Sequence, residues 1–540
     1  MDKNTVIGLL LIFGLFLGFS FYQTNRAKQY REAQEQQMAE QAAQRAEETA
    51  RLSLEQDTTS TNPTGDKPVS SALQFSNPQL ADTSDYIVET DKAYYCFSKK
   101  GGCLKHLYLK NVYRYTPKGE PKVMLELFEG GTNDMSIDLQ LKDQSEISTA
   151  DCFFMADVDD TLVVDEKHKT LSLRLYPNVK DDTAQCQTQD AQSYIEYLYT
   201  FDNNDYRFGF KVRFVNMGKY LYANKHNYTL NWNATPRGVE KNFETEKMLT
   251  SIYYMDNVND VGNLDERKDD RKEFTSPLKW VSVKQQFFTA CLIVDDKPFS
   301  SGSLSVRGFD KSETSKLKEC MASLDFEIPD VDKGAFGMSM YVGPNQYKLL
   351  RSYGLKLEHQ VPLGWGFFLL HWINRFAIIP VFNWLSNYGL NYGLIILILT
   401  VILKVVLLPV SYKTYMSSAK MRALKPEMEA INAKYPKEED MMKKQQATMS
   451  LYKSAGVSPA GGCLPMLLQM PILIAMYRFF PAAYELRQQS FLWAEDLSTY
   501  DSIWDFGHTV PLYGDHMSLF TILMTIATLV YTWLNNKLMN

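Results

Sequence analysis

Long apolar runs alternate with polar segments along this chain, and they predict membrane helices joined to a soluble domain. Residues 389–410 form the longest run, which reads GLNYGLIILILTVILKVVLLPV. As a helix this run is long enough to cross a bilayer, and Lys404 is the only charge in it. Shorter apolar runs predict an N-terminal anchor at residues 1–24 and two further spans at 462–480 and 517–534.

The N-terminal run lacks a small-x-small cleavage site, so we interpret it as an uncleaved signal anchor, with a cleaved signal peptide as the alternative. The segment that follows, residues 25–85, begins with Gln, Glu, Ala and Arg and continues with Ser, Thr, Pro and Asp. Such a composition predicts a polar helix followed by a flexible linker.

Residues 86–350 change to a period of two, which is the spacing of β-strands. The clearest example is the pair of segments 194–201 and 206–214, separated by Asp-Asn-Asn-Asp. The second segment has Tyr206, Phe208, Phe210, Val212 and Phe214 on one face and Arg207, Lys211 and Arg213 on the other. We therefore predict a hairpin with one buried face, and a large antiparallel β-sandwich over the whole region.

Residues 361–388 are apolar but interrupted by His371, Asn374 and Arg375, whose spacing places them on one helix face. This pattern predicts an amphipathic helix lying in the membrane interface, with a short span as the alternative.

Loop charges predict the orientation in the membrane. Residues 411–460 carry nine Lys/Arg and five Asp/Glu, whereas residues 481–516 carry one Arg and six Asp/Glu. The positive-inside rule places the 411–460 loop, a predicted helical hairpin rich in Met, in the cytoplasm. This orientation makes the 481–516 loop periplasmic or outside. The same holds for residues 22–388, which include the large β region, and the N-terminus is then cytoplasmic.

Polar side chains inside the apolar runs are the candidate functional residues. A charge at membrane depth is costly and marks a pathway when it faces protein or water, although Lys404 can also snorkel to the interface. Thr521, Thr525, Thr528 and Thr532 share one helix face. Together with Lys404, Thr400 and Gln469 they predict a polar groove; the alternative is that the threonines bond their own helix and pack helices together.

Composition excludes several functions. A net charge of −6 gives no reason to expect nucleic acid as a partner, and no phosphate-binding, zinc-binding or hydrolase motif is present. The seven cysteines are too few for a disulfide-built fold, and free buried thiols are expected. We predict no cofactor, no metal and no covalent chemistry.

Four stretches resemble the YidC/Oxa1/Alb3 family of membrane protein insertases, specifically its bacterial type. They are YVGPNQYKLL (341–350), TVILKVVLLPVSYKTYMSSAKMRALKPEM (400–428), LYKSAGVSPAGGC (451–463) and GGCLPMLLQMPILIAMYRFFPAAYELRQQSFLWAEDLS (461–498). The resemblance implies an α+β inner-membrane protein with an N-terminal signal-anchor helix, a periplasmic β-supersandwich and a polytopic helical insertase core. It also implies nascent membrane proteins as clients and the Sec translocon and ribosome as partners.

Two departures from the family pattern are visible. The family has arginine at the groove position held here by Lys404, so the positive charge is kept but the bidentate guanidinium is lost. Members of this type have two further spans after the fourth, and the sequence ends at Asn540, so we expect a partial chain. Two other functions remain open from the residues alone: a transporter that uses Lys404, and a membrane-anchored envelope-binding protein.

Overall fold

A computed structural model describes residues 85–539 with short gaps. The gaps are residues 118, 157–159, 166–167, 181–186, 223–225, 311, 365–367, 437–439, 457–463 and 511–513. The predicted anchor (1–24) and residues 25–84 of the predicted linker region lie outside the described residues.

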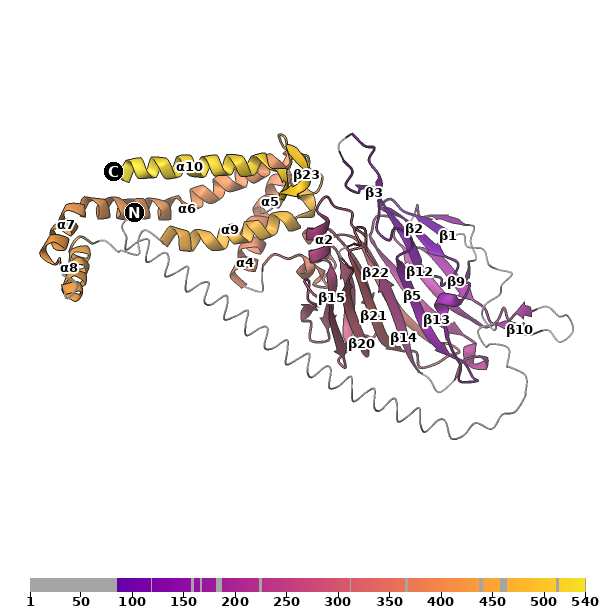
Figure 1. Ribbon diagram of the computed structural model, residues 1–540. Coiled ribbons are helices and arrows are strands. Elements are labelled where there is room, and N and C mark those ends of the chain that lie inside the picture. Colours follow the sequence, from indigo (N-terminus) through magenta and orange to yellow (C-terminus); the bar gives the residue numbers. More distant parts are fainter. Residues whose placement is uncertain are drawn as a thin grey trace. The chain divides into compact units, whose positions relative to one another are not determined.

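Three sheets make up the β domain, residues 85–344, and their strands pair antiparallel except for β1 with β8 (Figure 1). The largest sheet is, in spatial order, β16 (Val261–Asn263), β15 (Ser251–Asp256), β18 (Leu278–Lys284), β19 (Phe288–Val294), β22 (Ala335–Pro344), β13 (Arg207–Val215), β12 (Tyr194–Phe201), β9 (Lys169–Leu175) and β7 (Met155–Ala156). The second is β17 (Asp270–Phe274), β20 (Ser301–Gly308), β21 (Lys318–Glu327), β14 (Asn227–Ala234), β5 (Asn133–Gln140) and β6 (Glu146–Ser148). The third is β4 (Met124–Glu126), β3 (Leu104–Tyr113), β2 (Ala93–Ser98), β1 (Asp85–Glu89) and β8 (Thr161–Val163).

Two small hairpins and a series of helices complete the described chain. The hairpins are β10 (Asn178–Lys180) with β11 (Gln187–Gln189) and β23 (Trp504–Val510) with β24 (Gly514–Met517). The α-helices are α2 (Phe243–Leu249), α3 (Tyr347–Ser352), α4 (Phe368–Ile373), α5 (Ile379–Ser386), α6 (Tyr392–Ala423), α7 (Lys425–Lys434), α8 (Met441–Ser454), α9 (Leu464–Ala482) and α10 (Leu519–Met539). Single turns are η3 (Thr149–Asp151), η4 (Met217–Lys219), η5 (Leu357–Gln360) and η9 (Tyr484–Leu486), and η6 (Asn374–Ile378) is a π-helix.

The predicted hairpin is confirmed by the pairing of β12 with β13, in which Tyr197 lies opposite Val212. Phe208, Phe210, Val212 and Phe214 are buried, while Lys211 and Arg213 on the other face are exposed. The period-two pattern therefore identified both the strands and the face that enters the core.

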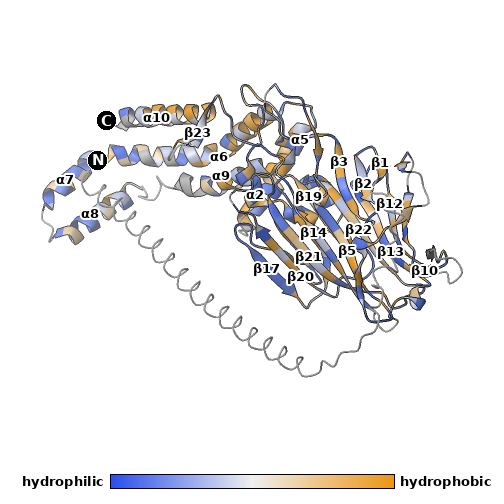
Figure 2. Cartoon of the chain, turned by 45° about the vertical axis from the view of Figure 1, so that its right-hand side comes forward, coloured by the Kyte–Doolittle hydropathy of each residue, from blue (hydrophilic) through white to orange (hydrophobic). Residues whose placement is uncertain are grey.

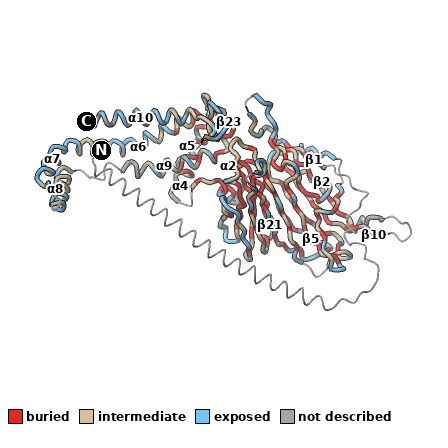
Figure 3. The backbone as a smooth tube through the Cα atoms, viewed as in Figure 1, coloured by how far each residue is buried: buried red, intermediate tan, exposed pale blue. Residues whose placement is uncertain are grey.

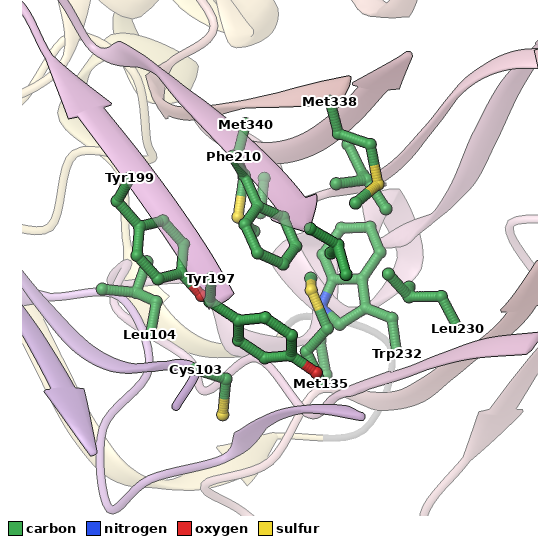
Figure 4. Close-up of a cluster of buried hydrophobic side chains, with 14 of the residues drawn as sticks. Cys103, Leu104, Met135, Tyr197, Tyr199, Phe210, Leu230, Trp232, Met338 and Met340 are labelled. Carbon is green, nitrogen blue, oxygen red and sulfur yellow. The ribbon is translucent and has the colours of Figure 1, made fainter. Parts of the chain in front are cut away.

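The core of the β domain lies between the sheets, where the residues coloured as buried in Figure 3 gather. Figure 4 shows Tyr197 and Phe210 from the largest sheet beside Trp232 from the second. The rings of Tyr199 and Phe210 are stacked, with their centroids 4.8 Å apart. The polar end of the buried Trp232 side chain is satisfied, since its indole N–H donates to Asn133 Oδ1 at 2.8 Å.

The largest sheet is also covered on part of its outer face. Strands β18, β19 and β22 are buried at almost every position rather than at alternate ones. Trp280, Ile293 and Tyr341 from these strands form a second apolar cluster with side chains of α3, α4, α5, α6 and α9. One buried face was predicted for the 194–214 hairpin only, and in β18, β19 and β22 the helices that follow the domain cover the second face.

A buried ion pair joins the β domain to the segment after α9. Arg487 Nε lies 2.6 Å from Glu240 Oε1, and Arg487 Nη2 donates to the carbonyl oxygen of Tyr113 at 2.6 Å. A second carboxylate, Glu246 on α2, accepts hydrogen bonds from the backbone N–H groups of Val239 and Glu240. Burial, and then the neighbouring Glu240 charge, raise the pKa of Glu246 to about 8.

The five described cysteines, Cys96, Cys103, Cys152, Cys291 and Cys320, are free and buried, as expected. Burial raises the pKa of the Cys152 thiol to about 12, so this thiol is inert at neutral pH. Cys186 and Cys463 lie outside the described residues.

Phe210→Ala is expected to lower the free energy of unfolding of the β domain by about 3–5 kcal/mol, because it leaves a cavity in the core. Lys211→Ala, one residue along on the exposed face, is the matched control and should change it by less than about 0.5 kcal/mol. Pulse proteolysis of the purified chain across a urea series measures both. Equal losses for the two variants would contradict the assignment of faces.

Glu246→Gln is expected to raise the melting temperature more at pH 8 than at pH 5.5. The unfolded carboxyl has a pKa of about 4.3, so between that value and about 8 the folded state binds the extra proton and stability falls as pH rises. The glutamine variant lacks this loss. Glu244→Gln, on the exposed face of the same helix, serves as the control in thermal unfolding and should show no such pH dependence.

Candidate functional site

The chain after the β domain is helical, and α6 is the one described helix that is long and apolar enough to cross a membrane. A shorter apolar helix covers residues Leu519–Leu534 within α10. Figure 2 shows hydrophobic residues prevailing along α10 and hydrophilic residues prevailing in α7 and α8.

Helix boundaries differ from the sequence-based ranges in two places. The α6 helix continues without a break past Val410 to Ala423, into the predicted cytoplasmic hairpin, because residues 411–423 retain good helix formers and no glycine. The hairpin itself then consists of α7 and α8. The predicted amphipathic helix at 361–388 is divided into α4, the π-helix η6 and α5.

Asn374 explains how this divided helix is held. Its side chain is fully buried and donates hydrogen bonds to the carbonyl oxygens of Leu363, at 2.7 Å, and Ala475 on α9, at 3.0 Å. The sequence placed Asn374 on a polar face with His371 and Arg375. Its position at the start of a π-helix, where the backbone register shifts, instead directs it towards α9.

Lys404 lies on an exposed face of α6. The opposite side of the first turns is anchored, since Ile395 and Leu399 are buried against α5 and α9. Lys404 and Thr400 are one turn apart, both are exposed, and Thr400 donates to the carbonyl of Ile396 at 2.8 Å. Within the described part of the chain, the Lys404 ammonium forms no ion pair or hydrogen bond.

The apolar neighbours of Lys404 are exposed as well. Val401, Val405 and Leu408 are each more than half exposed, and Figure 3 shows exposed residues along this part of α6 and along α10. Exposed apolar surface on a helix of this length is suited to lipid or to an apolar segment of another protein.

The threonine row on α10 is exposed along its length. Thr525, Thr528 and Thr532 each donate to the carbonyl four residues earlier, at 2.8–2.9 Å. Such bonds within the helix are those expected if the threonines serve only helix packing. They also leave each hydroxyl oxygen free to accept a hydrogen bond from another group. Thr521 differs, because its hydroxyl oxygen lies 2.9 Å from Ser518 Oγ.

The candidate groove residues are placed on three helices, α6, α9 and α10. Gln469 is half-buried on α9. Figures 1 and 2 show α10 running alongside α6, but no hydrogen bond among the described residues joins Lys404 to Gln469 or to a threonine of α10. Whether these residues act together remains a prediction of the sequence.

Three interactions outside the predicted set position the helices: Asn374 to α9, Arg487 to Glu240, and Asp501 to the start of α10. In the sequence analysis, residues 481–516 were considered only as an acidic loop, so the last two of these interactions were not predicted. Ser518, which precedes the apolar run of α10, is a typical N-cap residue and was the available signal for the third interaction. Among the described residues no cluster of His, Cys, Asp and Glu is arranged to hold a metal ion.

These features define a class: a membrane protein with a large β-rich domain followed by a helical region that contains an exposed, membrane-length helix. Residues 86–376 match the family described as the YidC periplasmic domain, and residues 384–540 match the 60Kd inner membrane protein family. The chain belongs to the YidC family of membrane protein insertases.

Named relatives match this chain over nearly all of its length. Proteins named membrane protein insertase YidC from Bacteroides fragilis and Parabacteroides distasonis are 36% and 35% identical to this chain, over 98% and 100% of it and 82% and 84% of their own lengths. A crystal structure of an active YidC insertase covers 77% of this chain and 78% of its own, at 18% identity and a TM-score of 0.24, which adds no weight.

Proposed function

We propose that this chain inserts proteins into the bacterial inner membrane and assists their folding, with nascent membrane proteins as its clients. The observation that carries the proposal is the exposed ammonium of Lys404, one turn from Thr400, on an otherwise apolar helix that is long enough to cross the membrane. The names of the relatives and both family assignments support the same function.

The proposed site is a polar groove formed by Lys404, Thr400, Gln469 and the four threonines of α10. A polar or acidic segment that crosses the bilayer loses its hydration, and this costs free energy. A positive charge and hydroxyl oxygens at membrane depth lower that cost, while Val401 and Val405 next to Lys404 offer apolar surface to the client's hydrophobic segment. Insertion by this route makes and breaks no covalent bond, so we assign no enzymatic reaction.

We further propose a multi-pass topology with spans at residues 1–24, 389–410, 462–480 and 517–534. The N-terminus and the 411–460 hairpin lie in the cytoplasm, and residues 22–388 and the 481–516 loop lie in the periplasm or at its membrane face. The description of the family matched by residues 86–376 as a periplasmic domain supports this orientation. Exposed Trp372, Phe376 and Trp384 support an interfacial position for residues 361–388.

The cytoplasmic hairpin is the proposed contact for clients and the ribosome, with the Sec translocon as a second partner in the membrane. Met441, Met442 and Met449 on α8 are exposed, whereas Met428 on α7 receives a hydrogen bond from the Tyr452 hydroxyl within the hairpin. The exposed methionines supply adaptable apolar contacts for varied sequences. A transporter is not favoured, because the relatives are named insertases.

The charge of Lys404 can be tested by substitution. Lys404→Glu should reduce insertion of a single-span client with an acidic tail roughly tenfold, the equivalent of about 1.4 kcal/mol, because it replaces attraction with repulsion. Lys404→Arg should preserve insertion. Protease protection of the translocated tail measures the yield.

Lys413→Ala is the matched control for that experiment, since Lys413 is exposed on the same helix beyond the apolar run. A client with a neutral tail should be affected little by any of these variants. Equal loss for both clients would show that Lys404 supports the fold and not the passage of charge.

Photocrosslinking during synthesis of the same client tests the route. Probes at positions 404 and 525 should give client adducts, and a probe at position 523, on the opposite face of α10, should give none. Adducts of equal yield at all three positions would contradict a polar groove and favour threonines that only stabilise helix packing.

A further inference from the structure

The segment between α9 and α10, residues 483–518, contacts the β domain, α6 and α10. On the β-domain side, Arg487 pairs with Glu240, and Gln488 Nε2 donates to the Tyr113 carbonyl at 2.8 Å. The Arg487 guanidinium also lies 5.1 Å from the centre of the Phe288 ring. These contacts are buried, and they fix the beginning of the segment against the sheets.

The same segment packs closely against the start of α6. A side chain added at Gly393 would place its Cβ only 2.0 Å from the Phe491 ring, so only glycine permits this approach. Next to it, Asn391 caps α6 by accepting from the Gly393 N–H at 2.9 Å, and its amide donates to the Ser490 carbonyl at 3.1 Å. The first turn of the helix that bears Lys404 is therefore fixed to this segment.

At its other end the segment holds the first turn of α10 through Asp501. Asp501 is 8% exposed, and its Oδ2 accepts from the Phe520 backbone N–H and from the Trp493 indole N–H, both at 3.0 Å. Its Oδ1 accepts from Ser518 Oγ at 2.5 Å. The Trp493 ring lies against Phe520 with centroids 4.5 Å apart.

These bonds complete the cap of α10. The first N–H groups of a helix have no partner within the helix. Ser518 Oγ accepts from the Thr521 N–H at 3.1 Å, and Asp501 accepts from that of Phe520. Burial favours the neutral carboxyl, but the hydrogen bonds from Ser518, Phe520 and Trp493 outweigh it and lower the pKa of Asp501. Its negative charge also suits a helix N-terminus.

We infer that Asp501 is a positioning residue that fixes the rotation of α10 about its axis, and so determines which way the threonine row faces relative to α6. Two directional hydrogen bonds to Asp501, from Ser518 Oγ and from the Phe520 N–H, hold one side of the first turn of α10. The segment that carries Asp501 is itself fixed to α6 and the β domain. Beyond its first turn, most residues of α10 whose burial the structure describes are exposed, so within the described part of the chain the cap is the principal constraint on its rotation. This inference deepens the proposed function, because it rests on the threonine row lining the groove.

The test compares Asp501→Ala with Asp501→Asn in the full chain reconstituted in lipid vesicles. A spin label on an encoded keto amino acid is placed at position 525 or 523, and its collisions with oxygen and with a polar nickel complex are measured without any client. With Asp501 present, the two positions should differ in accessibility, 523 being the more accessible to oxygen. Asp501→Ala should abolish this difference.

Asp501→Asn should keep the difference, because an amide oxygen still accepts from Phe520 and Trp493, and the amide N–H₂ can donate to Ser518. Asp505→Ala is the control variant; Asp505 lies in the same segment, is exposed and accepts from Ser502. An unchanged difference in Asp501→Ala, or loss of the difference in Asp505→Ala as well, would overturn the inference.

Client insertion is measured on the same vesicles. The positioning role of Asp501 and the groove lined by the threonine row can therefore be rejected independently of each other. If Asp501→Ala abolishes the accessibility difference but leaves insertion of the acidic-tailed client unchanged, Asp501 positions α10 and the threonine row is not part of the route. If the difference is lost and insertion falls, with both restored by asparagine, the positioning role and the groove are supported together.

Discussion

Burial of both faces of strands β18, β19 and β22 is the constraint on which the arrangement of the helices depends. One face packs against the second sheet, and the other needs an apolar cover that α3, α4, α5 and α9 supply. Because Ile395 and Leu399 of α6 join the same cluster, the first turns of α6 are fixed through these helices. Leu403 still packs against this cluster, whereas Lys404, Val405, Val406 and Leu408 beyond it are exposed.

An insertase needs a rigid framework and an adaptable surface for its clients, and along α6 and α10 these two lie in different parts of the helices. The ends that adjoin the β domain are rigid, held by caps, a close glycine contact and buried ion pairing. The exposed portions carry both apolar surface and polar groups, which allows contact with clients of different sequence because no single shape is imposed. In the proposed groove, the fixed contacts therefore lie at the ends of the helices that adjoin the β domain, and the surface offered to clients lies beyond them.

The β domain was predictable because a period of two needs only local sequence, as the β12–β13 hairpin shows. The apolar run around Lys404 was predictable for the same reason. The double burial of β19 was not, since an all-apolar strand reads the same whether one or both of its faces are covered. Nor were the bonds of Asn374 to α9 and of Asp501 to α10, because each joins residues distant in sequence. The faces of Lys404 and Thr525 follow from helix periodicity, but whether they meet depends on helix packing that no local pattern encodes.

The α6 helix is continuous and has the geometry of a lever. Its 32 residues correspond to about 48 Å of helix, which exceeds the hydrocarbon thickness of a bilayer, about 30 Å. Pro409 lies within it and removes the backbone hydrogen bond to residue 405, directly beside Lys404. A load applied to the α7–α8 hairpin would be carried along this helix and would bend it most easily at Pro409. The position of Lys404 relative to the anchored first turns of α6 would then change with the load at the other end of the helix.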